Sequence, residues 1–142
     1  MLTQVEADKL ILVKKLFVKL ETISLPPGSD LTYELVSEDK QEQFLLDLWR
    51  GTFRFSKIKF QNRARQVLVL VRLDVDGSPH TNPDGQKFTG THIHYYREGY
   101  DDRWAFPLDL SVFTNTSDIA LTLEQFCGHC NIEKPSYQGW LT

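Results

Sequence analysis

Apolar side chains recur at every second position in several stretches of this sequence, and this pattern limits the possible folds strongly. Residues 31–35 alternate apolar and polar side chains, which is the period of a β-strand with one face buried, and Phe44, Leu46 and Leu48 repeat this two-residue spacing. Residues 67–71 are apolar throughout and form the most apolar candidate strand. We therefore predict an antiparallel sheet in which residues 67–71 form a central strand.

Weaker signals indicate further strands. Residues 53–55 and 58–60 predict one strand with an irregularity near Ser56, after a turn at Gly51. The remaining predicted segments are a strand at residues 91–97 and a short extended segment at residues 104–108.

The two ends of the chain predict helices. Thr3 and Glu6 form a capping-box pattern, and apolar residues at helical spacing extend the first predicted helix to about Leu20. A second helix is predicted at residues 115–130, capped by Asn115 or Thr116. We find no internal repeat or linker, and so expect one α+β domain, residues 1–142. Its antiparallel sheet of about five to six strands is flanked by an N-terminal and a C-terminal helix.

The composition excludes several classes of protein. A length of 142 residues and a hydrophobic share of 41% suit a single folded domain and not a disordered chain. No apolar run reaches the roughly 18 residues that a membrane span needs, and the N-terminus lacks the pattern of a secretory signal. Only two cysteines occur, Cys127 and Cys130, too few for a disulfide framework. We expect a cytoplasmic protein without membrane association.

Charge is distributed unevenly along the chain. The formal net charge is −3, yet no acidic residue lies between Asp47 and Asp74. That stretch carries Arg50, Arg54, Lys57, Lys59, Arg63, Arg65 and Arg72. Any attraction to a polyanion is therefore expected to be local. Arg63 and Arg65 alternate before the predicted central strand, a position that fits either a phosphate-binding edge or the protection of a strand edge.

The segment HIHYYR, which begins at His92, is chemically the most informative. Residues two apart on a strand point to the same side, so His92, His94 and Tyr96 are predicted to share one face while the residues between them face the core. A long predicted loop, residues 76–85, carries His80 toward the two imidazoles. Such long loops are often functional, although a plain hairpin connection is the alternative.

Three interpretations fit these histidines. They can lie on a solvated strand face, bonded to loop carbonyls. They can ligate zinc or a related ion, with the coordination shell completed by His80, Asp74, Asp76 or Asp84. They can form a metal-free acid–base pair, because imidazole titrates near neutral pH.

Metal-free acid–base chemistry suits phosphodiester cleavage best. Arg97 and Arg103 can offset charge that develops on a phosphorane. Aromatic side chains beside them offer stacking surfaces for unpaired bases, namely Tyr95, Tyr96, Tyr100 and Trp104. A hairpin turn with surface ion pairs is the alternative for this segment.

The tetrapeptide CGHC, from Cys127 to Cys130, matches the dithiol motif of disulfide isomerases. It ends a predicted helix instead of beginning one, however, and at that end the helix dipole disfavours a thiolate. Two cysteines on an apolar stripe are better explained as core residues, and a zinc site is the minor alternative.

Together these motifs resemble a family of short bacterial proteins of unknown function, some of them from mobile elements. The resemblance covers nearly the whole chain and rests on residues 61–65 (QNRAR), 79–85 (PHTNPDG), 92–94 (HIH) and 96–100 (YREGY). It implies no activity. A histidine-bearing loop before a paired-histidine strand also resembles, in architecture, the ribonuclease toxins of toxin–antitoxin modules.

The sequence hypothesis is therefore a small RNA-cleaving, toxin-like protein that needs no metal or other cofactor. His92 and His94 form its acid–base pair, open to solvent, with His80 as a helper and Arg97 on the phosphate. The predicted RNA-binding residues are Arg63, Arg65, Tyr96, Tyr100, Arg103 and Trp104. Its partners would be RNA and a cognate protein such as an antitoxin.

Two rival hypotheses remain. One is a non-enzymatic interaction protein, such as a mobile-element inhibitor of a host factor, that binds through the turn from Tyr100 to Trp104. The other is a metal-binding hydrolase.

Overall fold

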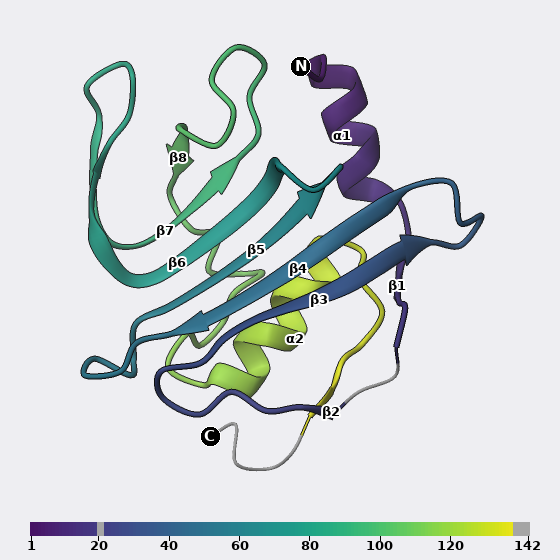
Figure 1. Cartoon of the computed structure of the whole chain (residues 1–142). Coiled ribbons are helices and arrows are strands. Elements are labelled where there is room, and N and C mark those ends of the chain that lie inside the picture. Colours follow the sequence, from purple (N-terminus) through teal and green to yellow (C-terminus); the bar gives the residue numbers. More distant parts are fainter. Residues whose placement is uncertain (20–21, 138–142) are drawn as a thin grey trace.

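A seven-stranded antiparallel sheet organises the computed structural model, which describes residues 1–19 and 22–137. In sheet order its strands are β1 (Lys15–Phe17), β3 (Asp30–Ser37), β4 (Gln43–Arg50), β5 (Ile58–Ala64), β6 (Leu68–Thr81), β7 (Lys87–Tyr95) and β8 (Ala105–Phe106). Two short parallel strands, β2 (Thr22–Ile23) and β9 (Ser136–Tyr137), pair separately. The helices are α1 (Gln4–Leu12) and α2 (Ile119–His129), near the two ends of the chain (Figure 1). The predicted α+β class is confirmed.

The two faces of the sheet differ in chemistry because side chains alternate along each strand. One face is apolar and packs against α2, where the rings of Phe60 and Phe126 lie 6.0 Å apart. Ile93 is buried on this side, as predicted. The opposite face, called here the polar face, carries two cross-strand rows, Trp49–Lys59–Asp74–His92 and Asp47–Gln61–Arg72–His94.

The first helix is shorter than predicted. It has the predicted capping box between Thr3 and Glu6, but it ends at Leu12, and the chain then turns into β1. Lys15 ends the helical pattern: its fully buried Nζ donates hydrogen bonds to the carbonyls of Ile11, Val13 and Cys130. One cation thus satisfies carbonyl groups at the ends of both helices. Leu20, the predicted helix end, lies outside the described residues.

The second helix also starts later than predicted. Its N-cap is Asp118, whose side chain accepts a hydrogen bond from the Leu121 amide, whereas Asn115 and Thr116 precede the helix. Residues 53–55 form no strand: Phe53 is 93% exposed in the turn between β4 and β5. Cys127 and Cys130 are fully buried free thiols, which confirms their assignment to the core.

The predicted loop at residues 76–85 is mostly strand. β6 continues to Thr81 and pairs with β7 as far as Lys87, so only a tight turn remains between them. The outer half of this hairpin bends away from the rest of the sheet (Figure 1). Turn-forming residues in the sequence mark bulges within a strand here, not a free loop.

Within the described part of the chain, no helix has the length and apolar character needed to span a membrane.

Candidate metal centre

Two adjacent strands bring the candidate site together. In the register of β6 and β7, Asp74 lies opposite His92 and Arg72 lies opposite His94. Residues directly opposite one another share a face of the sheet, so all four side chains meet on the polar face. The prediction that His92 and His94 emerge side by side is confirmed, since their ring centroids lie 5.0 Å apart.

A bend in the hairpin adds His80 to this pair. The register of β6 against β7 shifts on both sides of Gly77, and Gly90 opposite it has φ +76°. Bulges of this kind bend a strand and redirect its side chains. As a result the His80 ring lies 4.6 Å from the His94 ring and 5.9 Å from the His92 ring, measured between centroids.

Asn82 holds His80 and the last strand in place. Its amide group bonds to both backbone groups of Ala105, at 2.8 and 2.7 Å, as a neighbouring strand would. Its Oδ1 also lies 2.9 Å from His80 Nε2, which lies 3.0 Å from the carbonyl of Arg103. Because these two oxygen atoms act as acceptors, Nε2 of His80 carries the proton and Nδ1 is its proton-accepting atom.

Backbone carbonyls fix the orientation of the other two imidazoles. His92 Nδ1 lies 3.0 Å from the Gly90 carbonyl, and His94 Nδ1 lies 2.8 Å from the Asp102 carbonyl. A carbonyl can only accept, so both Nδ1 atoms are protonated. The Nε2 atoms of His92 and His94 then lie 3.2 and 3.4 Å from Asp74 Oδ2.

This arrangement leaves several buried polar atoms without a hydrogen bond. Among the described residues, His92 Nε2, Asp74 Oδ1 and Arg72 Nε have no hydrogen-bond partner, although the Asp74 oxygen atoms lie within 3.2 to 3.4 Å of these nitrogens. In a neutral His92 with its proton on Nδ1, Nε2 is an acceptor that lies 3.2 Å from a carboxylate oxygen, which can only accept as well. Buried atoms of this kind are costly unless a ligand satisfies them.

Opposing effects set the charges of the cluster. Burial raises the pKa of Asp74, but the imidazoles of His92 and His94 together with Arg72 lower it more, so its pKa lies far below the usual range. Burial lowers the pKa of His94, which favours a neutral ring at neutral pH. Its Nε2 then accepts from Arg72 Nη2 at 3.0 Å, while Arg72 Nη1 lies 2.7 Å from Asp102.

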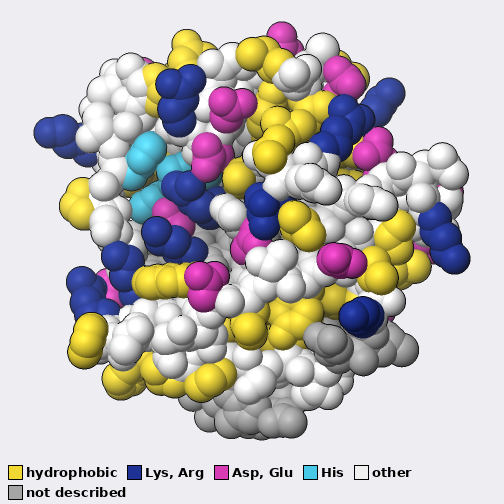
Figure 2. Space-filling view, viewed as in Figure 1, with side chains coloured by type: hydrophobic (Ala, Val, Ile, Leu, Met, Phe, Trp, Pro, Cys, Tyr) yellow, Lys and Arg dark blue, Asp and Glu magenta, His cyan; other side chains and the backbone are white. Residues whose placement is uncertain are grey.

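The burial of the two rings contradicts the prediction that they are open to solvent. His92 is 1% exposed and His94 is fully buried, because His80 and the segment that contains Asp102 and Arg103 lie against them. The Arg72 and Asp102 side chains are 25% and 29% exposed, and they form the more open side of the cluster. On this face, histidine atoms are visible between basic and acidic side chains (Figure 2).

The geometry matches that of a transition-metal site. Asp74, His92 and His94 each offer one ligand atom, and these atoms lie within 4.8 Å of one another. Donor atoms around a tetrahedral ion with bonds of about 2.0–2.1 Å are about 3.3–3.4 Å apart, close to the 3.2 and 3.4 Å between the Nε2 atoms and Asp74 Oδ2. Carbonyl groups on the Nδ1 atoms are the outer partners that orient metal-ligating histidines.

The predicted partner residues in the turn that follows β7 lie elsewhere. Arg97 stacks on Trp104, with its guanidinium carbon 3.9 Å from the ring centroid. Arg103 lies near the Tyr100 ring and donates to backbone carbonyls of its own turn. Tyr96 does not share the face of the histidines: it is buried in the apolar core, and its hydroxyl donates to the Leu2 carbonyl.

The basic stretch is largely neutralised by acidic partners. Arg63 forms a two-point ion pair with Asp47, and this pair lowers the carboxyl pKa against the opposing effect of burial. Arg65 Nη2 lies 3.2 Å from Glu42 Oε1, beyond one end of β5. Beyond the other end of this strand, Arg54 pairs with Asp76. The strongly basic sheet surface expected from the sequence is therefore interrupted by carboxylates.

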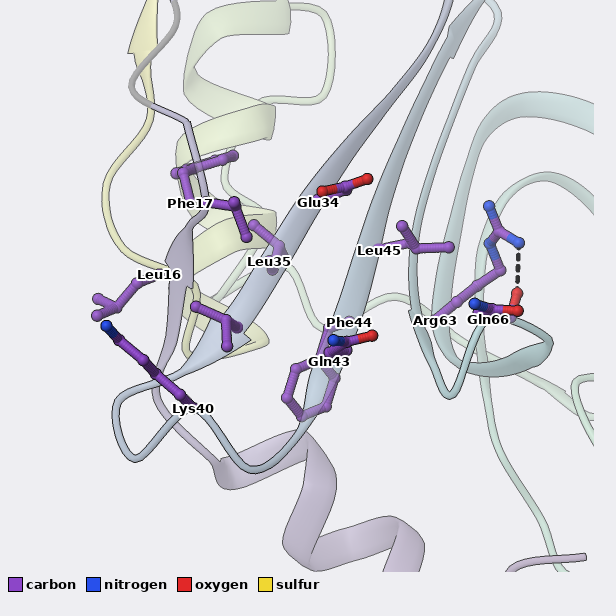
Figure 3. Close-up of a pocket in the computed structure, with 12 residues that line it drawn as sticks. Leu16, Phe17, Glu34, Leu35, Lys40, Gln43, Phe44, Leu45, Arg63 and Gln66 are labelled. Carbon is purple, nitrogen blue, oxygen red and sulfur yellow. Dashed lines mark hydrogen bonds between the residues drawn. The ribbon is translucent and has the colours of Figure 1, made fainter.

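A separate groove of about 940 Å³ lies over β1, β3 and β4. Its apolar side chains include Leu16 and Leu45, and Arg63 at its rim bonds to the Gln66 carbonyl (Figure 3). None of its lining residues is a histidine or a cysteine.

Sequence reasoning considered Asp74 only as one of several possible ligands and overlooked Arg72, Asn82 and Asp102. A signal for two of them was present, because Arg72 and Asp74 alternate on a strand as His92 and His94 do. Placing these pairs side by side required the register of the hairpin. Asn82 and Asp102 act through contacts that no spacing in the sequence indicates.

The fold and the site define a class: a small α+β domain whose antiparallel sheet has one face covered by a helix and a buried histidine–carboxylate cluster on the other. The chain belongs to the family DUF6978, a family of unknown function whose model matches residues 2–132. The predicted membership of a family without an assigned activity is thereby confirmed. No curated protein and no solved structure gives a significant match.

Proposed function

We propose that this protein binds a divalent transition-metal ion of the zinc class through Asp74, His92 and His94 and acts as a metal-dependent hydrolase. The observation that carries the proposal is the unsatisfied Nε2 of His92, which lies 3.2 Å from Oδ2 of Asp74 inside a buried cluster. The other oxygen of this carboxylate, Oδ1, also lacks a hydrogen bond among the described residues. A cation at the meeting point of these atoms would satisfy them together.

Three protein ligands are typical of a catalytic site, because they leave a coordination position for water or substrate. A metal ion bound there would lower the pKa of a coordinated water toward about 7 and would polarise a substrate oxygen. The Asp102 and Gly90 carbonyls hold the two imidazole rings, so the ligands need little rearrangement.

His80 is suited to handle the proton in such a reaction. Its ring lies beside both ligand imidazoles, it is only partly buried, and its Nδ1 is the free accepting atom. A general base has to lie within hydrogen-bond reach of the proton that it takes, and a position beside the metal ligands brings His80 close to a metal-bound water. His80 therefore keeps a helper role, now beside a metal ion instead of beside an acid–base pair.

Titration of chelator-treated protein with zinc tests the proposal. We expect one equivalent to bind, and the Asp74→Asn and His92→Gln variants to bind more than about 100-fold more weakly, since loss of even an outer partner of a ligand costs about 10–100-fold. Asp76→Asn is the matched control, because Asp76 lies two residues from Asp74 but pairs with Arg54 and Ser56.

The contrary result is equally clear. If folded wild-type protein binds no zinc, cobalt or manganese, and NMR finds a proton on His92 Nε2, the cluster is a buried imidazolium–carboxylate pair and the proposal is wrong.

Metal-independent RNA cleavage gains less support from this arrangement. Acid–base catalysis by His92 and His94 requires both rings to reach a substrate, and both are buried. RNA is one phosphodiester substrate on which the hydrolase activity of the metal-loaded protein can be tested.

A binding function is favoured by a different observation. Tyr100, Trp104 and Arg97 form a cluster in which Arg97 lies over the Trp104 ring and the Tyr100 and Trp104 rings meet edge to face, 5.0 Å apart. Tyr100 is 37% exposed. Aromatic and arginine side chains often dominate protein interfaces. Loss of partner capture in Tyr100→Ala, with normal capture by His92→Gln, would support the interaction protein over the hydrolase.

A further inference from the structure

Among the residues that the structure describes, Arg72 supplies the guanidinium that contacts the candidate metal ligands directly. Its Nη1 is held by Asp102 at 2.7 Å, while its Nη2 lies 3.0 Å from His94 Nε2. Its Nε lies 3.4 Å from Asp74 Oδ1 and has no hydrogen bond within the described chain. The Nε–Nη2 edge of the guanidinium therefore faces the ligand atoms, and the opposite side is anchored.

Metal binding would change what this edge contacts. An ion on Asp74, His92 and His94 takes the Nε2 lone pair that Arg72 Nη2 now uses. The anchor to Asp102 does not depend on that contact. The Nε–Nη2 edge would then present two free donors next to the ion, on the more exposed side of the cluster.

The charges then favour an anion. Asp74 and Asp102 are opposed by Arg72 and by a divalent ion, while the two imidazoles are neutral when they act as ligands. Lys59 adds a further cation on the same face, opposite Asp74 in the register. The divalent ion, Arg72 and Lys59 together outweigh the two carboxylates, so the completed site is positive.

We infer that the metal-loaded protein binds a phosphoryl group, as phosphate or a phosphate ester, between the ion and Arg72. A guanidinium fork takes two oxygens of an oxyanion at once. The ion needs one more oxygen, and a tetrahedral phosphoryl group supplies all three, whereas a carboxylate has only two. This inference rests on the proposed metal site and names the substrate class of the hydrolase.

Cobalt-loaded protein gives a direct test, because the visible spectrum of bound cobalt reports both the metal and its further ligands. We expect inorganic phosphate to perturb the spectrum of the wild type, and Arg72→Gln to bind phosphate at least tenfold more weakly while still binding cobalt. Arg103→Gln is the matched control, since the Arg103 guanidinium donates to the Gly99 and Tyr100 carbonyls of its own turn. It should bind phosphate as the wild type does.

Each other outcome overturns a specific step. Equal phosphate affinity in the wild type and Arg72→Gln would overturn the role of Arg72. Acetate binding as tight as phosphate binding would overturn the phosphoryl assignment. A wild type that binds no cobalt would overturn the metal site itself, and the inference with it, and this result is visible before any phosphate is added.

Discussion

Gly77 shows how closely the candidate site is packed at the level of single residues. A Cβ at this position would lie 3.1 Å from Asp74 Cβ, 3.4 Å from the Gly90 carbonyl oxygen and 3.7 Å from His92 Cε1. Only a residue without a side chain lets the bulged strand approach two of the proposed ligands this closely.

The first prediction concerns this contact. Gly77→Ala should displace Asp74 or His92 by a few tenths of an ångström and weaken zinc binding by about tenfold, the lower end of the cost of disturbing a ligand's surroundings. Zinc titration of the variant measures the effect. Gly128→Ala, in α2 at a position with an ordinary φ where a Cβ meets nothing, is the control for the general effect of glycine replacement.

Lys15 is a second residue whose role follows from its surroundings. It is fully buried and its Nζ is 4.9 Å from the Phe44 ring centroid, in addition to its three carbonyl partners. Burial lowers the pKa of Lys15 to about 8, from an ordinary value of 10.5. The folded protein therefore disfavours the charged form more than the unfolded chain does.

This pKa predicts a pH dependence of stability. Between about pH 8 and 10.5 the unfolded chain keeps the Lys15 proton while the folded protein releases it, so this group makes folding more favourable as pH rises. The free energy of unfolding of the wild type should gain up to about 3 kcal/mol relative to Lys15→Met across this range. Urea unfolding of both proteins at several pH values measures it, and a pH-independent difference would contradict the lowered pKa.

The β6–β7 hairpin is the element that assembles the site. Its inner half, where the strands pair without a register shift, supplies Asp74, His92 and His94. Its bent outer half places the His80 ring against the ring of His94. The hairpin reaches β8 through the Asn82 side chain, which replaces the missing backbone pairing. This amide group and His80, whose Nε2 lies 3.0 Å from the Arg103 carbonyl, connect the outer half of the hairpin to the segment that contains β8.

Removal of that amide group should loosen the element without unfolding the domain. Asn82→Leu leaves both backbone groups of Ala105 unsatisfied, and we expect a loss of about 1–3 kcal/mol in unfolding free energy. Hydrogen exchange of the Ala105 amide should accelerate more than exchange in β4 and β5. Thr81→Ala, at an exposed neighbouring position, is the control.

At the scale of the whole molecule, the two faces of the sheet carry different kinds of side chain. The face against α2 holds the apolar core and both thiols, and the polar face holds the charged cluster. Burial raises the pKa of the Cys130 thiol to about 12, and it raises that of Cys127 as well. We therefore expect the two thiols of the CGHC motif to be unreactive in the folded protein.

A thiol assay checks this assignment. With Ellman's reagent the native protein should react only at the rate of global opening, and two equivalents should react at once in denaturant. Rapid reaction of one thiol in the native state would show that α2 opens locally, which the tight core contacts of Phe126 and Cys127 do not predict.

The sequence indicated the main strands of the sheet, the presence of two helices, the buried cysteines and the neighbouring imidazoles correctly, because each depends on alternation or capping within a few residues. The prediction from sequence was wrong where a contact with a residue far away in the chain sets the end of a helix or strand. The first helix ends early since Lys15 bonds across to Cys130, and the long loop is strand since β7 pairs with it.

The amino-acid sequence by itself determined which residues face the same side of each strand, and so placed His92 beside His94. Only the tertiary structure decided which side chains contact these rings and how far the rings are buried. The register of β6 against β7 brings Asp74 and Arg72 to them, and the folded-back hairpin and following turn bury them. Local periodicity fixes the face on which each side chain lies, and so limits the possible registers. Which residues become neighbours, and how deeply they are buried, depends on contacts between segments far apart in the chain.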